Sequence, residues 1–325
     1  SVGIVGQAGV MICIGGSLGL FLQIYGERLL QSTGRTDLSM ISQIAGAVCN
    51  IVLDPILIFG LLGFPRMEVA GAAVATITGQ FIGAALGLVL NHTKNPDVQL
   101  RLSGIRPHRA TMADIYAVGI PSIIMQSISS IMTYCMNLIL VQFTVTATAV
   151  FGVYFKLQSF FFMPVFGLNN GITPIIAYNY GARHRKRMLK TVKVSMFIAS
   201  CFTFIGFLAF EFIPKTLLEL FSASSDMLAI GIPALRIIGI HYLIAWFCII
   251  AGTVFQALGK AIYSMIVSIM RQLFVLVPAA YILASIGGLH AVWWAFPIAE
   301  IISLIVSVAF LVVINRTIIQ KITEA

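Results

Sequence analysis

The sequence predicts an all-α protein that crosses a membrane many times, and its bulk composition carries this prediction. Of the 325 residues, 59% are apolar and only 10% are charged, and the mean hydropathy is +1.00. A soluble chain has about 25% charged residues. Apolar runs of roughly 20 residues, each long enough to cross about 30 Å of hydrocarbon, recur along the whole chain. The alternating pattern in runs of about ten residues that indicates a transmembrane β-barrel does not occur in the sequence.

Nine membrane-spanning segments can be placed in order, at roughly 5–30, 38–63, 69–90, 114–142, 147–177, 188–212, 228–257, 261–286 and 289–315. Most connections are short, as expected between antiparallel neighbours in a helical bundle. The connection at 91–113 is long, polar and basic and contains two prolines, which predicts a linker between two lobes. We therefore expect four regions: a first lobe at 1–90, the linker at 91–113, a second lobe at 114–316 and a tail at 317–325.

Basic residues predict the orientation, because cytoplasmic loops are enriched in Lys and Arg. When the loops are placed on alternating sides, 15 basic residues fall on one side and two, Arg66 and Lys215, on the other. The richer side includes the linker, the run RHRKR at 183–187 and the tail. We expect a multi-pass protein of the plasma (inner) membrane with a cytoplasmic C-terminus. The net charge of +9 lies in these loops and does not indicate a nucleic-acid partner.

The five cysteines lie in apolar runs without the spacing of a metal site, so the sequence predicts no disulfide framework, structural metal or cofactor. The predicted partners are the lipid bilayer and small molecules, and we expect a monomer.

An internal repeat predicts the architecture. LLQSTGRTDLSMI at 29–41 aligns with VFQALGKAIYSMI at 254–266, an offset of 225 residues. Each copy ends one helix, turns at a glycine and begins another in the same direction, as in transporters built from two related halves. Three segments separate the linker from the helix that carries the second copy. The same count before the first copy predicts two pseudo-symmetric six-helix lobes, of which the first is incomplete here.

Asp54 is the candidate functional residue of the first lobe. A charged side chain at the centre of a membrane span costs about 2.5–3.5 kcal/mol on insertion scales, so such residues face a bundle interior or a wet pathway. Asn50 lies one turn earlier on the same helix face. Pro55 offers no N–H to the carbonyl of Ile51, which leaves another oxygen nearby. These groups predict a site for a small cation or a proton; the alternative is a polar cluster that only packs helices.

Several motifs resemble one transporter family. CNIVLDPILIFGLLGFPRMEVAGAAVATITGQ resembles the fifth and sixth helices of multidrug and toxic compound extrusion (MATE) transporters, and PVFGLNNGITPIIAYNYGARHRKRM resembles their eighth. SMIVSIMRQLFVLVPAAYIL and WAFPIAE resemble the last two helices. The resemblance covers essentially the whole chain, aligned to helices four through twelve, and implies an N-terminally truncated member. It implies two lobes around a central cleft that exchange cytoplasmic organic cations for external Na⁺ or H⁺.

The resemblance also implies a set of cation-binding residues. Asn50, Asp54 and Thr76 match three of the four residues of the N-lobe site, with Thr78 as the second choice for the threonine. A possible Na⁺ would be held at Asp54 and Asn50. The fourth residue, an acid on the first helix, has no counterpart in this sequence. Helices seven and ten lack the acids of NorM-like members, so the pattern is similar to the DinF-like branch.

Further polar residues are candidates for the substrate cleft, although each taken alone is more often structural: Gln126, Asn137, Lys156 and Asn179. Glu300, on the last helix, could be a second acid. The favoured alternative is a carboxylate that faces the bundle and pairs with Arg271 or with backbone.

Other functions remain as alternatives. An intramembrane hydrolase needs paired aspartates or an HExxH motif, and the sequence has one secure membrane aspartate and no such motif, so we expect no enzyme. A lipid-linked sugar flippase of the related superfamily would need several cationic residues for phosphates, whereas this cleft offers chiefly Lys156. A non-transporting truncated remnant is the third alternative. The substrate and the choice between Na⁺ and H⁺ stay open.

Overall fold

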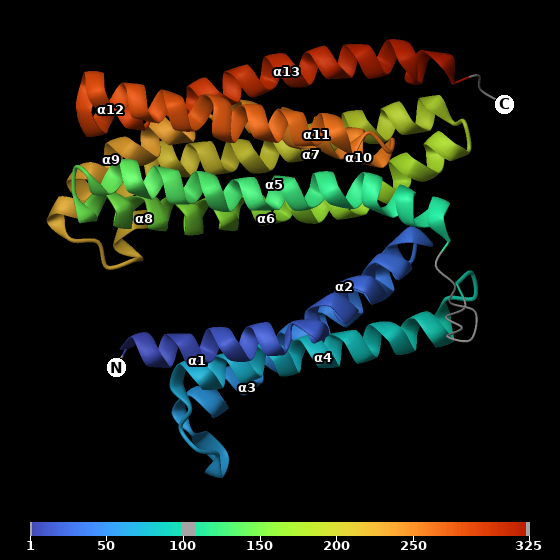
Figure 1. Ribbon diagram of the computed structural model, residues 1–325, viewed down its shortest axis with the longest axis horizontal. Helices are drawn as coiled ribbons and strands as arrows, with labels where there is room; N and C mark the ends of the chain where they lie inside the picture. Colours follow the sequence, from blue (N-terminus) through green and yellow to red (C-terminus); the bar gives the residue numbers. More distant parts are fainter. Residues whose placement is uncertain (1, 99–107, 323–325) are drawn as a thin grey trace. The chain divides into compact units, whose positions relative to one another are not determined.

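The computed structural model describes residues 2–98 and 108–322, and every regular element in these two ranges is a helix (Figure 1). The chain divides into two compact units, 1–106 and 107–325, and each is described by itself. Both ends of the predicted linker are helical, because α4 continues to Lys94 and α5 begins at Arg109. The predicted linker is therefore shorter than 91–113, and its residues 99–107 lie outside the described residues.

The first unit contains four α-helices and one 3₁₀ turn: α1 (Val2–Gly15), α2 (Ser17–Ser32), α3 (Thr36–Phe59), η1 (Leu61–Gly63) and α4 (Glu68–Lys94). Helix α4 is the centre of this unit, since α1, α2 and α3 all pack against it. The α3–α4 pair makes the most extensive of these contacts.

The second unit begins with three long helices, α5 (Arg109–Val141), α6 (Val145–Gly181) and α7 (Arg185–Phe212). Its remaining helices are α8 (Pro214–Glu219), α9 (Ser225–Gly239), α10 (Tyr242–Ala257), α11 (Ala261–Ile269), the π-helix η3 (Met270–Leu276), α12 (Val277–Val292), α13 (Ala295–Thr317) and the 3₁₀ turn η4 (Ile319–Lys321). Its core contains large buried side chains, among them Phe151, Tyr154, Phe210, Tyr242 and Trp293.

Seven helices of the described chain are long and apolar enough to cross a membrane, and the number rises to nine if each of two bent helix pairs is one span. These spans correspond to the nine predicted segments, and the all-helical polytopic class is confirmed. The difference lies in segments 5–30 and 228–257, which were predicted as continuous spans. Each is a pair of helices, bent by 47° between α1 and α2 and by 52° between α9 and α10.

The repeat found in the sequence has the same turn geometry in both units. Gly34 and Gly259 both have a left-handed backbone, with φ of +78° and +71°. The N–H of Arg35 donates to the carbonyl of Leu30 at 2.8 Å, and the N–H of Lys260 donates to the carbonyl of Phe255 at 2.8 Å. This is the Schellman pattern that ends a helix at glycine. The predicted glycine turns are therefore confirmed.

The two bends also obey the repeat. The break between α1 and α2 is at Gly16, and the break between α9 and α10 is at Ile240 and His241. The offset of 225 residues places Gly16 opposite His241, and it places the start of α3 at Thr36 opposite the start of α11 at Ala261. Each unit therefore repeats a bent helix followed by a glycine turn and a further helix.

Small residues let α3 and α4 approach closely. Every fourth position along the buried face of α4 is small: Gly71, Ala75, Gly79, Gly83 and Gly87. A Cβ atom on Gly79 would lie 2.7 Å from the carbonyl oxygen of Gly46 on α3, closer than real Cβ contacts allow. Close backbone approach of this kind stabilises helix pairs in lipid, where apolar burial supplies little driving force.

We expect Gly79→Ala to destabilise the first unit by about 1–3 kcal/mol, the range of an overpacked core. The new methyl group would push α3 away from α4, and it would also press on Asn50, whose Cβ would lie 3.2 Å away. Thermal unfolding in detergent measures the effect. Gly171→Ala on α6 is the control, because a Cβ there meets nothing within 4 Å. Equal melting temperatures for the two variants would contradict the close packing.

Candidate cation site

Asp54 lies within α3, directly before the helix-internal Pro55. The residue is half-buried, and its Oδ1 atom is buried with no hydrogen-bond partner among the described residues. No ion pair involves Asp54 in the described part of the chain. A buried carboxylate oxygen without a partner is unfavourable unless a cation, a proton or water completes its bonding. This atom is therefore the centre of the candidate site.

Asn50 connects Asp54 to the neighbouring helix. With its amide oriented so that both polar atoms are satisfied, Asn50 donates to Asp54 Oδ2 at 3.3 Å and accepts from the Thr76 N–H at 3.2 Å. The reverse orientation leaves only a contact of 3.4 Å between Asn50 Nδ2 and Thr76 Oγ1. Asn50, Asp54 and Thr76 therefore come together at the α3–α4 interface.

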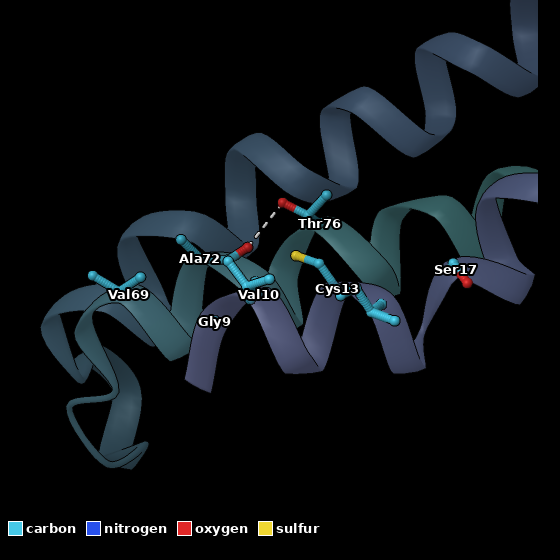
Figure 2. Close-up of a pocket in the computed structure, with 9 residues that line it drawn as sticks. Gly9, Val10, Cys13, Ser17, Val69, Ala72 and Thr76 are labelled. Atoms are coloured by element: carbon cyan, nitrogen blue, oxygen red, sulfur yellow. Dashed lines mark hydrogen bonds between the residues drawn. The ribbon is translucent and has the colours of Figure 1, made fainter. Parts of the chain in front are cut away.

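The threonine hydroxyls are used within their own helix. Thr76 Oγ1 donates to the carbonyl of Ala72 at 2.9 Å, as Figure 2 shows, and Thr78 Oγ1 donates to the carbonyl of Val74 at 2.8 Å. Thr76 contacts Asn50 and is exposed, while no described contact joins Thr78 to Asn50. The contacts therefore favour Thr76 over Thr78 as the third residue of the site.

Thr76 lines two pockets of the first unit. One pocket, of about 520 Å³, lies between α1 and α4 and is almost entirely apolar, with Cys13 and Val69 in its wall (Figure 2). The other, of about 420 Å³, lies between α2, α3 and α4 and also includes Asn50. Four further polar side chains line this second pocket: Gln23, Glu27, Gln43 and Gln80.

Glu27 is an acidic residue that the sequence analysis did not single out. It is half-buried on α2 and accepts a hydrogen bond from Gln23 Nε2 at 2.9 Å. The sequence signal that could have found it is the spacing of Gln23 and Glu27, two polar residues four positions apart inside the first predicted segment. The second pocket thus has one carboxylate and several amides in addition to the coupling candidates.

The four predicted cleft residues are not brought together in the second unit. Gln126 is exposed on α5, and Lys156 is exposed on α6 with its Nζ 5.7 Å from the centre of the Phe221 ring. Asn137 lines a pocket of about 620 Å³ that includes Tyr134, Phe151 and Phe155. Asn179 is buried, and its Nδ2 donates to the carbonyl of Ile175 at 2.8 Å. Their role in substrate binding stays a prediction.

Glu300 has one of the two partners that the sequence analysis favoured. Arg271 Nη1 lies 3.2 Å from Glu300 Oε2, and the Glu300 side chain is only 3% exposed. The pairing of Glu300 with Arg271 is confirmed. The described residues contain no group of three or more His, Cys, Asp or Glu side chains suited to a metal ion.

Comparisons with known proteins identify what this chain is similar to. A protein-family model described as MatE matches residues 121–282. The multidrug export protein MepA of Staphylococcus haemolyticus is 28% identical over 279 residues, which is 84% of this chain and 59% of that protein. MepA of Staphylococcus aureus (strain MSSA476) is 28% identical over 275 residues, with the same coverage. The chain thus spans 59% of the length of these relatives.

Solved structures extend the likeness to nearly the whole of this chain. The structure of the MATE multidrug transporter DinF-BH in complex with R6G is 31% identical, with a TM-score of 0.85, over 96% of this chain and 69% of that one. A crystal structure of a MATE protein in complex with MaL6 has a TM-score of 0.86 at 24% identity, over 98% of this chain and 70% of that chain. At that lower identity the likeness concerns the fold alone.

Proposed function

Because the chain belongs to the MATE family of membrane transporters, which are not enzymes, we propose that the full protein exports organic cations across the plasma membrane in exchange for Na⁺ or H⁺. The printed names of its relatives support the drug-export part, since MepA is a multidrug export protein and DinF-BH is a multidrug transporter. The exchange is coupled through Asp54, with Asn50 and Thr76 as neutral supporting groups.

The observation that carries the coupling role is the unpartnered Oδ1 of Asp54. Asn50 supports one carboxylate oxygen with a hydrogen bond and leaves the other one available for an incoming cation or proton. Because Asn50 also accepts from the Thr76 N–H on α4, occupancy at Asp54 would be transmitted to a second helix. Intramembrane acids in such positions mark ion pathways in many transporters.

The substrate would bind against aromatic and amide side chains of the second unit. The pocket at Asn137 offers the rings of the exposed Tyr134 and the half-buried Phe155, whereas Phe151 in its lining is buried. Ring faces attract organic cations by about 0.5–2 kcal/mol each, depending on how well the site excludes water. R6G, the compound bound in the DinF-BH structure, is therefore a suitable first probe.

Transport in liposomes tests the proposed function. We expect the full protein to move R6G against the R6G concentration gradient. A Na⁺ gradient and a pH gradient are imposed in separate experiments, and at least one of them should drive this movement. The gradient that drives R6G uptake identifies the coupling ion. Equal R6G flux with and without each gradient would contradict coupled exchange.

The distribution of basic residues supports a cytoplasmic position for the linker, the RHRKR run and the C-terminus. A cysteine introduced at Arg185, the first residue of α7, should not react with a membrane-impermeant thiol reagent added to intact cells. The same is expected for a cysteine at Ser103, which lies outside the described residues. A cysteine at Lys215 on α8 is the control that should react. Labelling at Arg185 and protection at Lys215 would reverse the proposed orientation.

A further inference from the structure

The second unit holds a buried ion pair that the proposed coupling site does not use. Arg271, in the π-helix η3, contacts Glu300 Oε2 on α13, and the other carboxylate oxygen, Oε1, is buried without a hydrogen-bond partner in the described chain. The side chain of Glu300 is 3% exposed and that of Arg271 is 33% exposed. The carboxylate is therefore deep in the unit, and the Arg271 side chain is only partly covered.

A cavity of about 50 Å³ lies beside this pair. Its polar lining comes from α6, the α9–α10 break, η3 and α13: Tyr154, Gln158, His241, Arg271, Gln272 and Glu300. One water molecule needs about 10–15 Å³ of such volume, so the space suits a few waters or one small monovalent cation. A π-helical turn inside a longer helix is frequent at functional sites, which agrees with a binding role for this position.

The repeat relates this cavity to the first unit. At the offset of 225 residues, the positions of His241, Arg271 and Glu300 hold small residues in the first unit, namely Gly16, Gly46 and Ala75. Conversely, the positions of the three coupling candidates hold apolar residues in the second unit, namely Val275, Ala279 and Ile301. The same pair of repeated helices thus carries a polar site in each unit, and the two sites use different positions.

The two sites differ in how their carboxylates are neutralised. Asp54 has no basic side chain within ion-pair distance in the described chain, whereas Glu300 has the guanidinium of Arg271. We propose that Glu300 could hold a monovalent cation, and that the guanidinium of Arg271 takes the place of that ion as a resident cation. The second unit therefore exchanges no Na⁺ or H⁺ of its own. This inference rests on the proposed function, because it takes the Asp54 site as the one that exchanges.

Removal of the resident cation should open the site. Without Arg271, an ionised carboxylate would be left buried and uncompensated, which is strongly unfavourable. The carboxylate must then take up Na⁺ or a proton, and the space left by the guanidinium adds to the cavity. The titratable groups that face Glu300 are Tyr154, His241, Cys248 and Arg271, and Arg271 alone among them carries a fixed positive charge.

Equilibrium binding of radioactive Na⁺ to the full protein tests this proposal in an Asp54→Asn background, which silences the first site. The protein that carries Arg271→Gln in addition to Asp54→Asn should bind one more equivalent of Na⁺ than Asp54→Asn alone. If it does not, it should show the infrared C=O band of a protonated carboxyl group. Adding Glu300→Gln should abolish either signal. Arg271→Lys, which keeps a resident cation, should gain neither.

Each outcome has one meaning. Absence of both signals in a folded Arg271→Gln protein overturns the proposal, as does a signal that survives Glu300→Gln. If Arg271→Gln folds only with Na⁺ or at acidic pH, the proposal is supported. If it unfolds under every condition while the Arg271→Gln/Glu300→Gln protein folds, the proposal is overturned. Na⁺ binding that persists in Asp54→Asn alone counts against the proposed coupling site, and the increment caused by Arg271→Gln is then judged separately.

Discussion

Asp54→Asn is expected to abolish gradient-driven export by the full protein while leaving it folded in the membrane. The substitution keeps the size of the side chain but removes its charge, so the amide can neither release a proton nor balance a cation. The hydrogen bond that Asn50 donates can be kept, because the amide oxygen of Asn at position 54 also accepts a hydrogen bond. Folding should survive, since an expensive charge at membrane depth is removed.

The two supporting residues should matter less, and in a fixed order. Asn50→Ala leaves the charge but removes the hydrogen bond that orients the carboxylate and links it to α4, so gradient-driven transport should fall about tenfold, less than for Asp54→Asn. Thr76→Ala should have the smallest effect, because Thr76 offers Asn50 its backbone N–H while its hydroxyl bonds Ala72. The expected order of loss is Asp54, then Asn50, then Thr76.

Transport in liposomes, normalised to the amount of folded protein, measures this series. Asp37→Asn is the matched control, because Asp37 is an exposed aspartate in the first turn of the same helix. Its transport should equal that of the unmodified protein. If Asp54→Asn folds normally and drives export at the unmodified rate, Asp54 is a packing residue and the proposed coupling site is wrong.

Arg271→Gln is expected to be the most destabilising single change in the second unit when Na⁺ is absent at neutral pH. Removing one partner of a buried ion pair costs about 3–5 kcal/mol, because the other charge is left uncompensated. Glu300→Gln should cost less than Arg271→Gln, because the Arg271 side chain that it leaves unpaired is one-third exposed, whereas the Glu300 side chain is 3% exposed. The double replacement should lie close to the unmodified protein, since no charge remains buried.

Thermal unfolding of the single and double variants in detergent tests this asymmetry. The control is the ion pair between Arg236 and Glu211, whose Nε and Oε1 atoms are 3.9 Å apart. Their side chains are 52% and 41% exposed. Breaking such a surface pair costs about 1 kcal/mol or less. Additive effects of Arg271→Gln and Glu300→Gln would show that the two side chains do not act as a pair.

The sequence by itself determined the features that depend on composition and on spacing within one helix. Apolar runs of membrane-spanning length predicted the helical spans, and the repeat at 29–41 and 254–266 predicted two matching glycine turns. The shared face of Asn50 and Asp54 follows from their spacing of four residues, and their hydrogen bond agrees with it. For Glu300 the favoured interpretation was a bundle-facing acid bonded to Arg271 or to backbone, and the structure shows the contact with Arg271.

Only the tertiary structure decided the features that depend on how helices cross. The contact of Asn50 with Thr76 exists because Gly46 and Gly79 let α3 and α4 approach. The small residues at every fourth position of α4 can be read in the sequence, but only the packing shows that they meet this face of α3. The bends at Gly16 and His241 cannot be predicted from hydropathy, because a bent span and a straight span have the same apolar length. Likewise, the place of Glu27 beside Asn50 comes from the packing of α2, α3 and α4 around one pocket. Composition and periodicity describe one helix at a time, whereas these sites are made where the faces of several helices meet.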